Sequence, residues 1–198
     1  MDLIRYHNLV PNEKIMLEYG ELDYFPHYFK DNDNFFTLFE EMDFKQNKIF
    51  IFGKKMDIPR LEIWFGDKDY TYSGNKIKAQ KMPREIEEMM NEIMQKTGCE
   101  FNSVLINKYR NGQDYASWHA DNEKELGDSP VIASVSFGAS RKFVLKGINK
   151  SSEQYGLLLQ DGDLLIMHRG IQEHYKHSLL KTSKKCGVRY NLTFRFII

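Results

Sequence analysis

The stretch FNSVLINKY, at residues 101–109, begins a second half of the chain in which short strands follow one another. It is rich in β-branched and aromatic residues, which favour extended structure. Turn residues separate it from further stretches of the same kind, at residues 131–138, 141–146, 155–160, 163–168 and 188–198. The dipeptide Asp161-Gly162 predicts a tight hairpin between two of these strands.

Two segments before residue 101 carry helical periodicity. The first can be capped by Asp33 or Asn34, and its apolar residues at helical spacing are Phe35, Leu38, Phe39 and Met42. The second has Pro83 in its first turn and ends near Gly98, and its apolar stripe is Ile86, Met89, Met90, Ile93 and Met94. Helices followed by a run of strands predict an α+β protein, with helices packed on an antiparallel sandwich or jelly roll.

Composition limits the class of protein. A chain of 198 residues with 41% apolar residues fits one globular domain. Its 28 basic and 28 acidic residues balance, which argues against strong nonspecific affinity for nucleic acid but allows a local basic face. Cys99 and Cys186 form no CxxC pair, so neither a disulfide scaffold nor a cysteine zinc site is expected. Without a signal-peptide core or a run of 18 apolar residues, we expect a soluble cytoplasmic protein with no membrane partner, and nothing predicts an oligomer rather than a monomer.

The tripeptide His119-Ala120-Asp121 is the first chemical signal. Residues two apart on a strand point to the same side, so the imidazole and the carboxylate can reach one metal ion. The segment HYKHS offers His174 or His177 as a third ligand, and the residues alone leave this choice open. Two histidines and one carboxylate on one face of an iron ion leave three positions for cosubstrate and oxygen.

The last predicted strand alternates between polar and apolar residues. One face carries Arg189, Asn191, Thr193 and Arg195. A guanidinium grips a carboxylate through paired hydrogen bonds, which suits an α-keto acid whose far carboxylate needs a partner. Asn107 and Tyr109 share one face of the earlier strand at residues 101–109 and are further candidates for this pocket.

Several segments occur in an order and spacing that resemble those of a known family. They are FGKKMDIPR, FGDKDYTYSG, FNSVLINKYRNGQDYASWHADNE, SPVIASVSFG, HYKHSLL and RYNLTFR. Between residues 48 and 195 the chain resembles the AlkB family of Fe(II)- and 2-oxoglutarate-dependent dioxygenases, and most of all its branch that acts on alkylated DNA. The resemblance implies a double-stranded β-helix (jelly-roll) core at about residues 99–198 and an N-terminal base-recognition extension at about residues 1–98, within a single domain.

The resemblance also implies a role for each matching residue. His119, Asp121 and His177 match the iron ligands, and Asn107, Tyr109, Arg189, Asn191 and Arg195 match the 2-oxoglutarate pocket. Within that pocket we expect Arg195 to hold the distal carboxylate of 2-oxoglutarate and Arg189 to support the carboxylate at the iron end.

The substrate residues follow from the same resemblance. Tyr72 matches the residue that stacks on the damaged base, with His119 on the other face, and Tyr70, Ser73 and Glu123 match neighbours of that base. Phe52 matches an apolar wedge that enters the base stack while the target base is extruded. Among several bunches of basic residues, Arg60 is our candidate for a phosphate contact.

The implied activity is oxidative demethylation of bases such as 1-methyladenine and 3-methylcytosine, with Fe(II), 2-oxoglutarate and O2, in the repair of alkylated DNA. Three alternatives remain open from the sequence. The same core can demethylate RNA or hydroxylate a protein side chain, the metal can be zinc in a hydrolase, or the sandwich can be a non-catalytic binding module.

Overall fold

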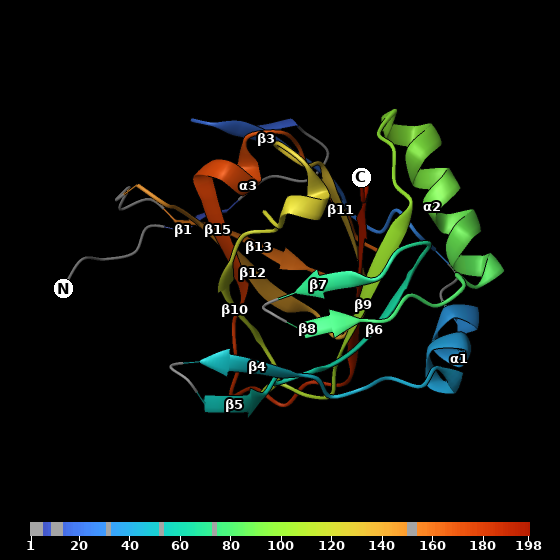
Figure 1. Cartoon of the computed structure of the whole chain (residues 1–198). Helices are drawn as coiled ribbons and strands as arrows, with labels where there is room; N and C mark the ends of the chain where they lie inside the picture. Colours follow the sequence, from blue (N-terminus) through green and yellow to red (C-terminus); the bar gives the residue numbers. More distant parts are fainter. Residues whose placement is uncertain (1–5, 9–13, 31–32, 52–53, 73–74, 150–153) are drawn as a thin grey trace.

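Two β-sheets pack face to face and form the body of the protein (Figure 1). The structure is a computed structural model that describes residues 6–8, 14–30, 33–51, 54–72, 75–149 and 154–198. Apolar side chains from both sheets meet between them, among them Leu22 and Met167 from one sheet and Phe143 and Leu157 from the other. This shared interior leaves room at one place for the site described below.

The larger sheet is antiparallel and has seven strands in the order β2-β3-β14-β11-β16-β9-β6. Its strands are β2 Lys14–Leu17, β3 Gly20–Phe25, β6 Leu61–Gly66, β9 Ser103–Tyr109, β11 Ile132–Gly138, β14 Leu164–Met167 and β16 Arg189–Arg195. β2, β3 and β6 come from the first half of the chain, so that half contributes directly to the sheet that carries β16.

The smaller sheet has five strands in the order β1-β13-β12-β15-β10, with β1 parallel to β13. Its strands are β1 Tyr6–Asn8, β10 Ala116–His119, β12 Arg141–Gly147, β13 Gln154–Leu159 and β15 Tyr175–Leu179. Two separate hairpins are formed by β4 Lys48–Ile51 with β5 Lys54–Asp57 and by β7 Tyr70–Tyr72 with β8 Asn75–Ile77. From β9 to β16 the chain passes repeatedly between the sheets, which confirms the predicted jelly roll.

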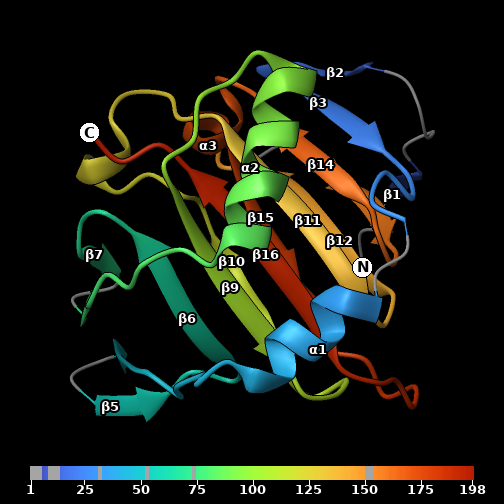
Figure 2. The same cartoon turned by 90° about the vertical axis from the view of Figure 1, so that its right-hand side faces the viewer.

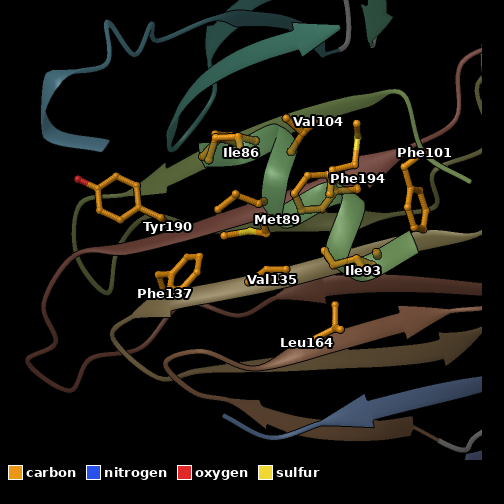
Figure 3. Close-up of a cluster of buried hydrophobic side chains, with 14 of the residues drawn as sticks. Ile86, Met89, Ile93, Phe101, Val104, Val135, Phe137, Leu164, Tyr190 and Phe194 are labelled. Atoms are coloured by element: carbon orange, nitrogen blue, oxygen red, sulfur yellow. The ribbon is translucent and has the colours of Figure 1, made fainter. Parts of the chain in front are cut away.

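Two helices cover the outer face of the larger sheet, as predicted (Figure 2). They are α1 Asp33–Glu41 and α2 Arg84–Thr97. Ile86, Met89 and Ile93 of α2 are buried against the sheet, beside Val135 and Phe194 (Figure 3). Because apolar side chains fill this face, the polar side chains of the candidate site lie on the opposite face, which is turned toward the smaller sheet.

The helix α2 begins and ends at the residues that the sequence predicts. Pro83 has extended backbone and immediately precedes the first helical residue, and Gly98 ends the helix in the left-handed conformation with a φ of 70°. Glycine adopts this conformation without the steric cost that a side chain would add. Two short helical segments also occur, α3 at Ile171–His174 and a 3₁₀ turn at Lys124–Leu126.

The predicted hairpin at Asp161-Gly162 is wrong. The strands on its two sides, β13 and β14, lie in different sheets and do not pair. The turn is instead bonded to β11, since Gly138 N donates to Asp161 Oδ1 at 2.7 Å and Gly162 N donates to Ser136 O at 2.8 Å. A turn dipeptide therefore marked the reversal correctly, but it could not show which strand receives the chain afterwards.

Cys99 and Cys186 are both free. In the ranges that the structure describes, no helix combines the length and the apolar character needed to cross a membrane.

Candidate active site

Two neighbouring strands of the smaller sheet position the three predicted metal ligands. β10 ends at His119, Asp121 follows it, and His177 on β15 lies opposite His119 in antiparallel register. One ligand atom from each residue lies within 4.8 Å of the other two, and the two imidazole centroids are 4.3 Å apart. The three side chains can therefore reach a single metal ion.

His174 lies outside this cluster. It ends α3, and its ring packs on the ring of Tyr19 with centroids 4.6 Å apart. Of the two histidines that the sequence left open, the structure brings His177 to the other two residues and places His174 near the surface.

Hydrogen bonds hold the ligands in place. His119 donates from Nδ1 to the carbonyl of Ser117 at 2.7 Å, which leaves Nε2 as the nitrogen able to bind a metal. The backbone N–H of Asp121 donates to Oε1 of the buried Gln172 at 2.9 Å. Arg195 donates from Nη2 to Asp121 Oδ1 at 3.0 Å.

The charges around the cluster favour the protonation states that metal ligands need. Burial lowers the pKa of His177 to about 3 and also lowers the pKa of His119, so both rings are neutral at pH 7. Burial alone would raise the pKa of Asp121, but the charge of Arg195 and its hydrogen bond to the carboxylate bring the pKa below its ordinary value. Neutral imidazoles and an ionised carboxylate are the forms that bind metal ions.

Arg189 supplies a second buried cation on β16. Its Nη2 donates to Ser136 Oγ at 2.8 Å, and its guanidinium lies 5.4 Å from the centroid of the Tyr109 ring. Burial lowers the pKa of Arg189 to about 10, which still leaves it positive at neutral pH. Its Nε and Nη1 have no hydrogen-bond partner among the described residues, and two such buried donors fit a carboxylate.

The two arginines are placed opposite to our expectation. Arg195, which we expected at the distal carboxylate, is bonded to the metal ligand Asp121. Arg189, which we expected at the iron end, lies at the other end of β16 beside Tyr109. Strand alternation showed correctly that both arginines share a face, but it carries no information about which end of the strand approaches the metal.

The remaining candidates for the cosubstrate pocket lie between these two arginines. Asn107 and Asn191 are directly opposite each other on β9 and β16, and both line the cavity that contains the metal ligands. Asn191 is held by a hydrogen bond from Nδ2 to Ser134 Oγ at 2.9 Å. Tyr109 lines the same cavity, and the guanidinium of Arg189 lies over its ring.

Arg60 does not lie where a phosphate contact requires it. Its side chain is buried and lines the cavity with His119, and its Nε donates to Asn107 Oδ1 at 2.7 Å. A contact with the nucleic-acid backbone needs an exposed guanidinium, so the structure corrects this expectation.

The other predicted substrate residues are placed only in part. Tyr70 and Tyr72 belong to β7, which pairs with β8, while their side chains lie outside the described part of the chain. Ser73 and Phe52 also lie outside the described residues. Glu123 is half-buried and immediately precedes the 3₁₀ turn, close in sequence to Asp121.

Sequence reasoning missed three residues that support the site. Ser136 had a signal in its strand, because it is a polar residue between the apolar Val135 and Phe137. Glu62 also had one, since it is a charged residue inside the apolar run LEIWF. Gln172 had none, because nothing in its neighbourhood indicates that it reaches Asp121.

The site combines two histidines and one carboxylate with buried arginines inside a jelly roll. That ligand set is typical of non-haem Fe(II) oxygenases. A family model described as the 2OG-Fe(II) oxygenase superfamily matches residues 23–195. The chain belongs to this superfamily, which implies Fe(II), 2-oxoglutarate and O2 as cofactor and cosubstrates.

Curated relatives place the chain near the AlkB proteins. It is 38% identical over 160 residues to "DNA oxidative demethylase ALKBH2" of Bos taurus, covering 76% of this chain and 58% of that protein. It is 38% identical over 150 residues to "Alpha-ketoglutarate-dependent dioxygenase alkB homolog 3" of Homo sapiens, covering 70% of this chain and 52% of that one. The chain thus spans a little over half the length of these two relatives.

A solved structure shares the fold. It is that of OsALKBH1, which superposes with a TM-score of 0.67 and 15% sequence identity and covers 93% of this chain and all of the other.

Proposed function

We propose that this chain oxidatively removes alkyl groups from the nitrogen atoms of DNA bases. The observation that carries the proposal is the meeting of His119, Asp121 and His177 at one point. It is supported by the buried Arg189 farther along β16, whose Nε and Nη1 have no hydrogen-bond partner among the described residues. The relatives named as DNA oxidative demethylases supply the substrate class.

His119, Asp121 and His177 would hold iron, and Arg189 would hold the distal carboxylate of 2-oxoglutarate, with Asn107, Tyr109 and Asn191 alongside. When bound, iron and 2-oxoglutarate would supply the oxidation with O2. One oxygen atom of O2 enters the N-methyl C–H bond, and the other enters succinate as 2-oxoglutarate loses carbon dioxide. The N-hydroxymethyl product then releases formaldehyde and the base is restored.

The protein's own contribution is to orient the reactants and to keep water out of the pocket. A methyl group on adenine N1 or cytosine N3 lies on the pairing edge, so the base must leave the stack before the reaction. The buried cation at Arg189 favours an oxygenase over a zinc hydrolase, because hydrolysis needs no partner for a dicarboxylate cosubstrate.

Mass spectrometry of an oligonucleotide that carries a single 1-methyladenine tests the proposal. The protein is incubated with Fe(II), ascorbate and O2, with and without 2-oxoglutarate, and the His177→Ala variant is compared with His174→Ala. We expect the mass of the oligonucleotide to show loss of the methyl group only when 2-oxoglutarate is present. This loss should occur with the wild type and with His174→Ala but not with His177→Ala.

The other outcomes separate the alternatives. Turnover of 2-oxoglutarate to succinate without loss of the methyl group from single- or double-stranded DNA would retain the oxygenase and reject the DNA substrate. Loss of the methyl group without 2-oxoglutarate would reject the oxygenase reaction itself.

A further inference from the structure

Glu62 is a buried carboxylate that the proposed reaction does not use. It lies on β6 directly opposite Asn107 of β9, and its side chain is 2% exposed. Asn47 donates from Nδ2 to Glu62 Oε1 at 2.8 Å, while Oε2 lies 3.6 Å from Nη2 of Arg60. Removing a carboxylate from water is costly unless a cation lies beside it, so Glu62 and Arg60 form one unit.

Arg60 carries this unit into the active-site cavity. Its guanidinium lines the same cavity as the metal ligands and is fixed by its hydrogen bond to Asn107. Arg60 and His119 line this one cavity, so the positive charge of Arg60 lies close to the place where the reacting carbon must lie.

Each of these two cations has its own carboxylate. Arg195 is bonded to Asp121, and Arg60 lies beside Glu62. Adenine methylated at N1 and cytosine methylated at N3 are cations at neutral pH, because the ring nitrogen uses its lone pair to bind the methyl group. A guanidinium without a compensating carboxylate would repel such a base across a short distance in a medium of low dielectric constant.

We propose that Glu62 determines specificity by compensating and positioning Arg60, so that the pocket admits a positively charged alkylated base. This inference rests on the proposed function and adds to it a residue that adapts the pocket to the charge of the substrate. Glu62 itself does not touch the base and acts through Arg60.

The test uses two substrates of nearly the same shape and different charge. One oligonucleotide carries 3-methylcytosine, which is cationic, and the other carries 3-methylthymine, which is neutral. The Glu62→Gln variant removes the charge of Glu62 but keeps an oxygen to accept the hydrogen bond from Asn47. We expect the kcat/KM ratio of 3-methylcytosine to 3-methylthymine to fall about tenfold in this variant, since the repulsion acts only on the cation.

Two further variants control for fold and charge. The double variant Arg60→Gln/Glu62→Gln removes both charges and should return the ratio toward its wild-type value. Glu88→Gln removes an exposed carboxylate on α2 and should leave the ratio unchanged. Fluorescence anisotropy of the same two oligonucleotides with metal-free protein gives the ratio of affinities without turnover.

The outcomes are distinct. If both substrates lose the same factor in Glu62→Gln, or if the ratio is unchanged, Glu62 has no role in specificity and demethylation itself stands. Failure of the double variant to recover the ratio would mean that the effect does not pass through Arg60. If the wild type demethylates neither oligonucleotide, the proposed function is wrong and the charge proposal falls with it.

Discussion

Arg189 and Arg195 occupy the two ends of β16, and their surroundings give them different tasks. Arg195 is bonded to a metal ligand, whereas Arg189 offers hydrogen-bond donors at the far end of the pocket. Under the proposed function, the guanidinium of Arg195 would orient a metal ligand and that of Arg189 would bind the cosubstrate.

Replacing each arginine by lysine should separate these tasks. We expect Arg189→Lys to raise the KM for 2-oxoglutarate about tenfold or more, because an ammonium loses the paired hydrogen bonds to a carboxylate. Arg195→Lys should instead weaken metal binding, by about tenfold, because Asp121 loses the partner that orients it. Anaerobic titrations with Fe(II) and steady-state kinetics measure the two effects, and the opposite pattern would restore the arrangement first expected from the sequence.

Gln172 gives a second prediction at this scale. In Gln172→Ala the buried N–H of Asp121 loses its acceptor, which costs about 1–3 kcal/mol. We expect weaker binding of Co(II), by roughly tenfold, when it is followed by its visible absorption. Gln113→Ala, at an exposed glutamine, is the matched control, and equal Co(II) affinity in both variants would contradict the role of Gln172.

At the residue level, sequence patterns predicted which side chains share a face of a strand. His119 and Asp121 followed from their spacing, and the polar face of β16 followed from its alternation. The pairing of Gln172 with Asp121 joins residues far apart in the chain, so no local pattern could contain it.

Among the elements, α2 is the one whose packing the sequence predicted most fully. Its apolar stripe fixed the buried face, and Ile93 is fully buried against the larger sheet (Figure 3). The apolar, strand-favouring sequences of β13 and β14 were equally clear, but they could not show that the chain changes sheet between the two strands. That choice depends on hydrogen bonds from the turn to β11, which the sequence does not display.

Shortening a buried side chain on the apolar face of α2 should destabilise the whole fold. We expect Ile93→Ala to lower the free energy of unfolding by about 2–5 kcal/mol, because the sheet below cannot close the cavity that remains. Urea denaturation measures the change. The exposed neighbour Gln95→Ala should change it by less than about 0.5 kcal/mol, and a similar loss in both variants would contradict this account.

The crossing between the sheets gives a separate prediction. Asp163 is fully buried and accepts hydrogen bonds from Tyr24 Oη at 2.6 Å, His27 N at 2.8 Å and Gln160 N at 2.7 Å. Asp163→Ala leaves these donors without a partner, and we expect a loss of about 3 kcal/mol or more in unfolding free energy. A change no larger than that of the exposed Asp128→Ala would show that the crossing does not depend on this carboxylate.

The whole molecule divides its site between two sheets. The metal ligands His119 and His177 belong to the smaller sheet, and Arg189 belongs to the larger one. From the sequence, the jelly roll and the presence of both sets of residues could be predicted. Their distribution between the layers follows from the long-range order of the strands, which local patterns leave undetermined.

This distribution makes the protein a linked system. A dicarboxylate that binds the metal on one sheet and Arg189 on the other would bridge the two sheets. Binding of the metal or of the dicarboxylate would then favour the distance between the sheets that the other one needs. Binding equilibria coupled in this way are reciprocal. We therefore expect Mn(II) to tighten binding of 2-oxoglutarate by about 5- to 150-fold and 2-oxoglutarate to tighten Mn(II) by the same factor. Isothermal titration without oxygen measures both factors, and their absence would mean that 2-oxoglutarate does not bind through the metal.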